Sequence, residues 1–253
     1  MLIIRRIFNY SYSIFFCIFI FVVSILSGLF SLLSMPISPS GMLAFLCMRF
    51  WSRSILWFCR VKVSVDGMEN IDQNKVQIFA SNHSSFFDVF VLNSIIPVKF
   101  GWISKKEIFN IPFIGWHMKA QGYVSIDRSD GRKALQSIKE AASKIRNGSR
   151  IVIFPEGTRT REKGVLQPFK KGLFHLCIRT RVPIVPMYIT GTFDILKPDS
   201  LLIRPFQKVY VKIGKELPTV DYPKNKTNIL MNDLRDRMVQ LEKGMNNRIK
   251  RAG

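Results

Sequence analysis

A histidine and an aspartate that could carry acid–base chemistry lie five residues apart, shortly after an apolar run. The run is Val76–Ala80, and His83 and Asp88 follow it within the polar segment Ser81–Asp88. On a regular helix this offset would not align the two side chains, but a turn at the start of a helix can bring them together. An aspartate bonded to one imidazole nitrogen fixes the tautomer, so the other nitrogen can take a proton from an alcohol. The pair therefore predicts a general base for acyl transfer, with a histidine that only stabilises the turn as the alternative.

A second polar segment follows another apolar run and carries an arginine suited to phosphate. Residues 151–154 read Ile-Val-Ile-Phe, and residues 155–160 read Pro-Glu-Gly-Thr-Arg-Thr. Arg159 can hold a phosphate with two parallel hydrogen bonds, and Thr158 and backbone N–H groups can add donors. Glu156 would repel a phosphate, so orienting Arg159 or holding the loop suits it better. The alternative is a surface turn with a solvated glutamate and arginine.

The stretch Ser104–Trp116, between these two segments, combines lysines with apolar side chains. Lys105 and the later Arg128 can complete an electropositive pocket. The apolar side chains that can line an acyl path or dip into a membrane are Ile108, Phe113 and Trp116. Core packing is the alternative for these three. A fourth stretch, residues 182–186, reads Val-Pro-Ile-Val-Pro and predicts a strand entry that either lines a hydrophobic groove or packs in the core.

From residue 61 onward, short apolar strands alternate with helical stretches. Continuous apolar runs predict buried strands, and period-two alternation predicts strands with one exposed face. The predicted strands are 61–65, 76–80, 99–103, 123–126, 150–154, 184–189 and 209–213, and the predicted helices are 132–146, 172–179 and the amphipathic 228–250. This alternation predicts an α/β fold with a mixed, mostly parallel sheet flanked by helices.

The N-terminal 60 residues form a hydrophobic region that is almost free of charge. No charged residue lies between Arg6 and Arg49, and the apolar run 7–33 exceeds the roughly 20 residues that span a bilayer core. The run is longer than the hydrophobic part of a signal peptide, and no clean cleavage site follows it. We therefore expect an uncleaved helical membrane anchor.

The form of this anchor depends on a second apolar stretch, residues 41–58. Arg49 and Arg53 within it would be costly at the centre of a spanning helix. Basic residues flank the whole apolar region on both sides, which places both of its ends in the cytoplasm by the positive-inside rule. A re-entrant helical hairpin satisfies this better than a single spanning helix. We expect an anchor over residues 1–60 and a cytoplasm-facing α/β domain over residues 61–253 that ends in an amphipathic helix.

The net charge indicates the kind of binding partner, and the cysteine pattern indicates whether to expect a disulfide or a metal site. The 253 residues include 38 Lys and Arg against 17 Asp and Glu, a formal charge of +21, which favours anionic partners such as nucleic acid or an anionic lipid surface. The hydrophobic N-terminal region favours lipid and argues against nucleic acid. The four cysteines form no C-x-x-C pair, and no histidine lies at a metal-ligand spacing from them, so we expect small buried thiols, no disulfide and no metal.

Together these segments resemble the motif blocks of the glycerolipid acyltransferase family, which includes the 1-acyl-sn-glycerol-3-phosphate (lysophosphatidic acid) acyltransferases. Residues 83–88 resemble its H-x-x-x-x-D block, and residues 154–159 match its F-P-E-G-T-R block. Residues 105–128 resemble the middle block and residues 182–186 the fourth, in the family's order. The resemblance covers about residues 60–215.

The resemblance implies transfer of a fatty acyl group from acyl-CoA or acyl carrier protein to the free hydroxyl of lysophosphatidic acid, giving phosphatidic acid. His83 would act as the general base and Asp88 would orient it. The implied substrate-binding group consists of Lys105, Arg128, Glu156, Gly157, Thr158 and Arg159. The resemblance implies no metal and no redox cofactor. The hydrophobic anchor and its flanking basic residues predict a location in the cell membrane, or the inner membrane of a bacterium, with the active site facing the cytoplasm.

Two other classes of protein fit parts of the sequence. A serine hydrolase could use Ser84 or Ser85 beside His83, but sequence neighbours rarely reach the same imidazole, and there is no G-x-S-x-G elbow. A membrane-surface lipid-binding protein would use the positive charge but would need no base. Within the family, other lysolipids, including lyso-amino-acid lipids and lysophospholipids, stay open as acceptors.

Overall fold

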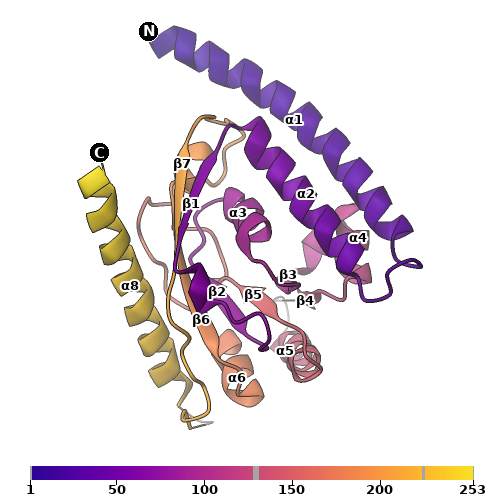
Figure 1. Ribbon diagram of the computed structural model, residues 1–253, viewed down its shortest axis with the longest axis vertical. Coiled ribbons are helices and arrows are strands. Elements are labelled where there is room, and N and C mark those ends of the chain that lie inside the picture. The colour runs from indigo at the N-terminus through magenta and orange to yellow at the C-terminus, as the bar shows by residue number, and fades with distance from the viewer. Residues whose placement is uncertain (1, 128–130, 224–225, 253) are drawn as a thin grey trace.

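A seven-stranded sheet forms the centre of the molecule in the computed structural model, which describes residues 2–127, 131–223 and 226–252 (Figure 1). The strand order is β1-β7-β6-β2-β5-β3-β4. The strands are β1 Lys62–Asp66, β2 Ile78–Ser81, β3 Gly101–Lys105, β4 Val124–Ile126, β5 Ile151–Ile153, β6 Ile184–Thr190 and β7 Lys208–Ile213. Every neighbouring pair is parallel except β6 and β7. The predicted mixed, mostly parallel α/β fold is confirmed.

Helices cover both faces of this sheet (Figure 1). They are α1 Leu2–Leu33, α2 Met42–Phe58, α3 Phe87–Ile95, α4 Ile114–Ala120, α5 Gly131–Arg146, α6 Lys171–Thr180, α7 Thr192–Ile195 and α8 Thr227–Ala252, with 3-10 turns η1 Met68–Asn70 and η2 Lys106–Asn110. Residues of α1 to α4 share one hydrophobic core, and residues of α5, α6 and α8 share the other.

Alternation along the central strands explains the two cores. Ile78 pairs with Ile151, and Phe79 pairs with Val152, in the parallel register of β2 and β5. Because successive side chains of a strand point to opposite faces, Phe79 and Val152 enter the core beneath α2 and α3, while Ile78 and Ile151 enter the core beneath α5, α6 and α8. Both faces of the strands are therefore covered, which is why they are continuous apolar runs in the sequence.

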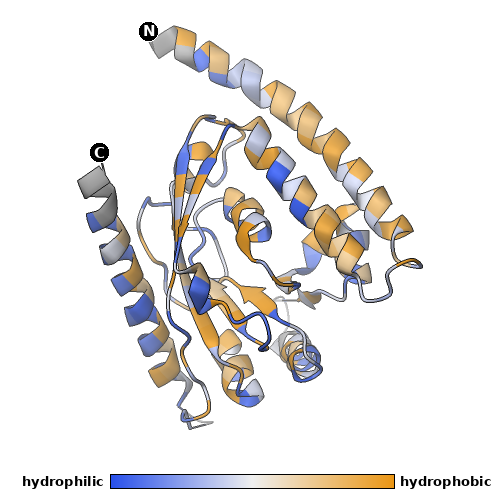
Figure 2. Cartoon of the chain, viewed as in Figure 1, coloured by the Kyte–Doolittle hydropathy of each residue, from blue (hydrophilic) through white to orange (hydrophobic). Residues whose placement is uncertain are grey.

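The first two helices form a hairpin that lies along one side of the molecule, and α2 packs between α1 and α3. Within the described residues one helix, Arg6–Leu33, is long and apolar enough to cross a membrane. Figure 2 shows hydrophobic residues along most of α1, and many of their side chains are exposed. Large exposed side chains on α1 include Ile14, Phe15, Phe21 and Leu26.

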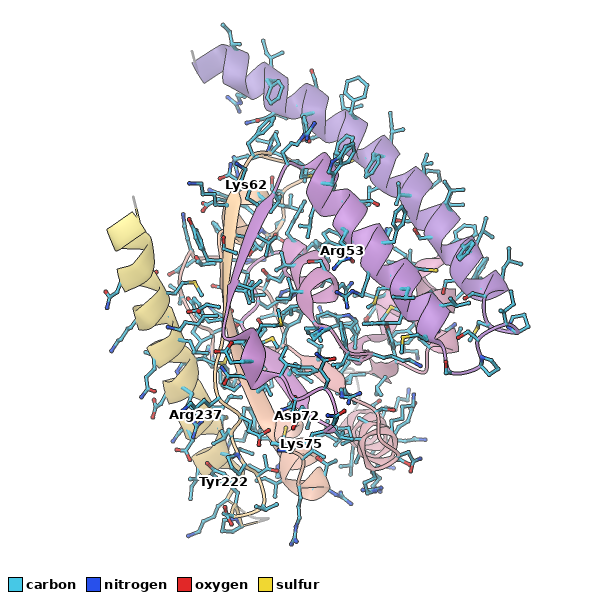
Figure 3. The ribbon with its side chains drawn as sticks, in the orientation of Figure 1. Arg53, Lys62, Asp72, Lys75, Tyr222 and Arg237 are labelled. Carbon is cyan, nitrogen blue, oxygen red and sulfur yellow. The ribbon has the colours of Figure 1, made fainter. Side chains whose placement is uncertain are left out.

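The two arginines of α2 point toward protein backbone rather than only toward solvent. Arg49 donates hydrogen bonds to the carbonyl oxygens of Ile96 and Ser94 at 3.0 and 3.1 Å, and Arg53 donates to Ser94 at 3.3 Å. Figure 3 shows Arg53 between α2 and α3. The guanidinium groups thus satisfy carbonyls at the C-terminal end of α3, where positive charge is favourable.

Three polar or close contacts fix α1 to the α/β unit. Ser13 Oγ accepts a hydrogen bond from the Ile203 N–H at 2.8 Å. Near the other end, Ser31 Oγ lies 2.5 Å from His117 Nδ1, and burial lowers the pKa of His117 to about 4, so the ring is neutral at neutral pH. Between them, a Cβ on Gly28 would lie only 2.8 Å from the Cβ of Phe113, so this position needs glycine.

Several local predictions are decided by burial. Ile184 and Val185 are fully buried, so the 182–186 stretch packs in the core and does not line a groove. The thiols of Cys59 and Cys177 are buried as expected, whereas Cys17 is exposed on α1 and corrects that expectation. The predicted amphipathic C-terminal helix is α8, whose buried face includes Leu230, Leu234, Met238 and Met245.

Candidate active site

The two polar segments singled out in the sequence meet at one edge of the sheet. Strands β2 and β5 are parallel neighbours, so the chain leaves both strands at the same edge. His83 comes two residues after β2, and the 154–160 segment follows β5 directly. The ends of parallel strands at the centre of an α/β sheet are where such folds place their sites.

A turn at the start of α3 brings the histidine and the aspartate together. His83 Nδ1 lies 2.9 Å from Asp88 Oδ2. The same oxygen accepts hydrogen bonds from the Ser84 and Ser85 N–H groups at 2.7 and 2.9 Å. Because the fully buried carboxylate only accepts hydrogen bonds when ionised, the imidazole donates through Nδ1–H and carries a lone pair on Nε2, on the opposite side of the ring.

Thr192 completes the environment of the aspartate and was not found from the sequence. Its hydroxyl donates to Asp88 Oδ1 at 2.5 Å and lies 3.0 Å from Ser84 Oγ. Thr192 opens α7, directly after β6, which neighbours β2 on its other side. It lies 104 residues from Asp88 in the chain, so only the strand order places the two side by side.

Two aromatic rings hold the imidazole in place. Phe154 stacks on His83 with ring centroids 3.8 Å apart and an interplanar angle of 5°. Trp102 of β3 stacks behind Phe154 at 5.2 Å. The first residue of the F-P-E-G-T-R motif therefore supports the histidine directly, which fixes the plane in which Nε2 lies.

The side chain of Glu156 bonds to backbone groups around the site and does not line the cavity. Its side chain is 1% exposed, and its two oxygens accept hydrogen bonds from the N–H groups of His83 at 2.7 Å and Gln167 at 2.8 Å. Burial raises the pKa of Glu156 from 4.5 to about 7, and the negative Asp88 adds to this, while the two N–H groups and Arg235 oppose it. The sequence groups Glu156 with the substrate-binding residues, but its carboxylate is engaged by two peptide groups and is absent from the cavity wall. Holding the loop, the role that charge repulsion suggested, fits this geometry.

His83 opens on a large cavity of about 1190 Å³. Its wall includes three of the predicted substrate-binding residues from the 154–160 segment, Gly157, Thr158 and Arg159, and also Lys105 at the end of β3. Arg159 lies over the ring of Phe86, with its guanidinium carbon 4.0 Å from the ring centroid. Arg128, the remaining predicted member, lies outside the described residues.

The rest of the cavity wall is mostly apolar and comes largely from the hairpin and from the middle block. Residues of α1 in the wall include Phe16, Ile20, Ile25 and Gly28, and those of the middle block include Ile108 and Phe113. Trp116, which the sequence grouped with them, is exposed on α4 and does not line the cavity. The cavity wall thus combines His83, the cationic Lys105 and Arg159, and a larger apolar part that includes residues of α1.

The arrangement suits proton abstraction beside an anionic group and an apolar chain. Gly157 has a left-handed backbone with φ of +70°, which glycine adopts at little cost, and this turn brings Thr158 and Arg159 to the cavity. Among the residues that the structure describes, no cluster of three His, Cys, Asp or Glu could hold a metal ion.

The Acyltransferase family model matches residues 62–190, about half of the chain, and the protein belongs to this family. The recognition made from the four motif blocks is therefore confirmed.

Particular relatives narrow the comparison. The chain is 37% identical over 177 residues to the 1-acyl-sn-glycerol-3-phosphate acyltransferase of Cocos nucifera, covering 70% of this chain and 56% of the relative. It is 34% identical over 180 residues to the enzyme of the same name from Saccharomyces cerevisiae, covering 70% and 58%. The chain thus spans somewhat more than half the length of these relatives.

A solved structure shares the whole fold. The crystal structure of the 1-acyl-sn-glycerophosphate acyltransferase PlsC from Thermotoga maritima superposes with a TM-score of 0.85, at 22% identity, over 96% of this chain and 98% of that one. This likeness extends over the α1–α2 hairpin and α8, beyond the residues that the family model matches.

Proposed function

We propose that the protein is a 1-acyl-sn-glycerol-3-phosphate O-acyltransferase, which acylates lysophosphatidic acid to phosphatidic acid in phospholipid biosynthesis. The observation that carries the proposal is the His83–Asp88 pair, joined at 2.9 Å, opening on an apolar cavity with Arg159 and Lys105 in its wall. The names of the relatives from coconut and yeast support lysophosphatidic acid as the acceptor.

The reaction follows from the protonation state of the pair. His83 Nε2 takes the proton of the acceptor hydroxyl, and the oxygen attacks the carbonyl carbon of the acyl thioester. The C–S bond then breaks, and the leaving thiolate takes the proton back from the imidazolium. Asp88 stabilises the imidazolium between these steps and keeps the ring from turning.

The cavity has a place for the phosphate of the acceptor and room for a long acyl chain. Arg159 can hold the phosphate with two parallel hydrogen bonds, and Lys105 adds a second positive charge. The volume of about 1190 Å³ exceeds the 300–1,000 Å³ typical of sites for small ligands, which suits a long acyl chain. The donor is acyl-CoA or acyl carrier protein, and the site uses no metal and no redox cofactor.

The hairpin gives this enzyme its place in the cell. Residues 1–60 serve as a re-entrant membrane anchor, and residues 61–253 form the catalytic domain on the cytoplasmic side of the cell membrane. The exposed apolar surface of α1 and the basic residues at both ends of the hairpin support this arrangement. The acceptor is then drawn from the same bilayer that holds α1.

The serine hydrolase alternative does not fit the geometry around His83. Ser84 Oγ bonds to Thr192, and Ser85 Oγ donates to the carbonyl oxygen of Leu196 at 2.7 Å. Both hydroxyls are thus directed to partners other than the imidazole. The relevant alternative is an acyltransferase acting on another lysolipid, and a lipid-binding protein without catalysis is the more distant one.

The test is acyl transfer by the purified full-length protein in detergent. Labelled acyl-CoA and acyl carrier protein are offered with lysophosphatidic acid, a lysophosphatidylethanolamine and a lyso-amino-acid lipid. We expect the highest rate with lysophosphatidic acid and a loss of about 10³-fold in His83→Ala, in line with removal of a general base. His175→Ala, at an exposed histidine of α6, is the matched control and should keep full activity. Unchanged transfer in His83→Ala refutes the base, and preference for another lysolipid refutes the acceptor.

A further inference from the structure

The loop between α7 and β7 exposes two large apolar side chains although it lies outside the anchor hairpin. Leu201 is 83% exposed and Phe206 is 64% exposed. Phe206 also has a left-handed backbone with φ of +63°, which is uncommon for a residue with a bulky side chain. Strained backbone of this kind persists where the surroundings hold it, and it is a reason to look for a function.

The backbone of this loop is fixed to both helices of the hairpin. The N–H of Ile203 donates to Ser13 Oγ on α1 at 2.8 Å, and the N–H of Phe206 donates to the carbonyl oxygen of Cys59 at the end of α2 at 2.9 Å. A third bond joins the Arg204 N–H to the carbonyl oxygen of Ile195. The apolar side chains are thus held outward by a docked backbone, beside the N-terminal half of α1.

Aromatic and basic side chains lie close in the chain to Cys59, the residue to which the Phe206 backbone bonds. Trp57, at the end of α2, is 64% exposed, and the guanidinium of Arg60 lies 5.3 Å from its ring centroid. Figure 3 shows Lys62 at the same end of the sheet, where β1 begins. The acidic residue of the loop, Asp199, pairs with Arg161 at 3.2 Å. Apolar tips with a tryptophan and basic neighbours are the composition that favours an anionic lipid interface.

The same loop is joined to the catalytic motifs. Leu196 lines the cavity, and its carbonyl oxygen accepts the hydrogen bond from Ser85 Oγ, three residues before Asp88. At the other motif, Arg161 follows Arg159 by two residues and makes the ion pair with Asp199. The loop therefore connects both motif loops of the site to the surface beside α1.

We propose that residues 199–206 form a second membrane contact, in which Leu201 and Phe206 enter the headgroup region of an anionic phospholipid bilayer. The contact holds the mouth of the cavity against the surface that supplies the lysolipid. Charge selects the occupant: Arg60 and Lys62 beside the apolar tips attract anionic headgroups, each basic residue near such a surface contributing favourably. The proposal rests on the proposed function only for the identity of that lipid substrate.

The first experiment measures contact without measuring catalysis. A full-length protein carrying Cys17→Ser and Cys47→Ser is given Leu201→Cys, labelled with an environment-sensitive fluorophore and reconstituted in phosphatidylglycerol vesicles. The matched control is Val220→Cys, because Val220 is 55% exposed and lies two residues from Tyr222, at the opposite end of the molecule in Figure 3.

We expect nitroxide lipids to quench the label at position 201 at least about threefold more than the label at 220, and aqueous iodide to show the reverse order. Equal access of iodide to both labels overturns the proposal, even if acyl transfer is demonstrated. Quenching at position 201 in a protein that transfers no acyl group supports the contact and refutes only the proposed function.

The second experiment links the contact to supply of the substrate. Leu201→Ser with Phe206→Ser should lower transfer to lysophosphatidic acid in phosphatidylglycerol vesicles by about tenfold, and should leave transfer in detergent micelles within about twofold. Val220→Ser with Ile229→Ser is the control pair and should change neither rate. Equal losses in vesicles and micelles would show a structural effect and would count against a membrane contact.

Discussion

The two motif loops of the site differ in where their polar side chains point. In the loop after β2, Asn82, Ser84, Ser85 and Asp88 all bond to protein groups inside the fold, and one edge of the His83 ring is left to the cavity. In the loop after β5, Glu156 is bonded inside, while Thr158 and Arg159 face the cavity.

This contrast separates two tasks. A general base works best when its position is fixed before the substrate arrives, because the reaction then needs no rearrangement. A phosphate ligand is met by long side chains that can adjust to it. Substitutions in the first loop should therefore lower kcat, and substitutions of cavity-facing groups in the second loop should raise KM for the lysolipid.

Asp88→Asn tests the fixed loop and should have the largest effect. An asparagine keeps the shape, and its amide oxygen can take the place of Asp88 Oδ2, but its NH₂ group then replaces the acceptor that meets the Thr192 hydroxyl. The neutral side chain also no longer stabilises the imidazolium. We expect kcat to fall by about 10²- to 10³-fold, with KM for lysophosphatidic acid within about threefold. Steady-state kinetics with circular dichroism as a check on folding measures this. A rise in KM at constant kcat would contradict the assignment of the first loop to the chemical step and of the second loop to substrate binding.

Arg159→Ala tests the cavity-facing loop and should have an intermediate effect. Loss of one charge-assisted pair to phosphate corresponds to a rise in KM of about 10- to 100-fold, with a smaller change in kcat. Arg161→Ala, assayed in detergent micelles where the membrane contact of residues 199–206 does not operate, is the matched control, because that side chain is exposed and its ion pair with Asp199 lies at the surface. Equal effects of the two substitutions would mean that position in the loop, and not the cavity, matters.

Glu156→Gln tests the internal group of the second loop and should have the smallest effect on activity and a pH-dependent effect on stability. The folded protein holds the Glu156 proton between pH 4.5 and 7, where the unfolded chain has released it, because the pKa is raised to about 7 in the fold. The stability that this residue contributes therefore falls as pH rises through that window. The variant lacks this titration and loses one acceptor for the two N–H groups.

Thermal unfolding in a fixed detergent at pH 5, 6.5 and 8 measures the difference. We expect the stability advantage of the native protein over Glu156→Gln to shrink by on the order of 1–3 kcal/mol from pH 5 to pH 8. Glu162→Gln, at an exposed position of the same loop, is the matched control substitution. An advantage that grows with pH would mean that the carboxylate is stabilised by the fold.

Local patterns predicted those parts of the molecule that depend on local physics. Continuous apolar runs predicted the central strands, because β2, β5 and β6 are covered on both faces. The spacing of His83 and Asp88 predicted their contact, because a helix start closes that turn. The bounds of most strands shift by one or two residues, and short helices such as α4 and α7 gave no periodic signal.

The partners that complete the site depend on strand order, which no local pattern contains. Thr192 reaches Asp88 across 104 residues, and Gln167 reaches Glu156 through a long loop. The stacking of Phe154 on His83 likewise requires that β2 and β5 be neighbours. The motif resemblance grouped Glu156 with the substrate-binding residues, but its bonds to the N–H groups of His83 and Gln167 could be seen only in three dimensions.

The helix α1 supplies both a wall of the cavity and the apolar outer surface of the molecule, through opposite sides of the same 32 residues. Deleting α1 to obtain a water-soluble protein would therefore remove part of the wall of the cavity proposed to hold the acyl chain. A soluble version is better sought by substituting polar residues only for exposed side chains such as Ile14, Phe15 and Ile18. Phe16 and Ile20, which line the cavity, are kept.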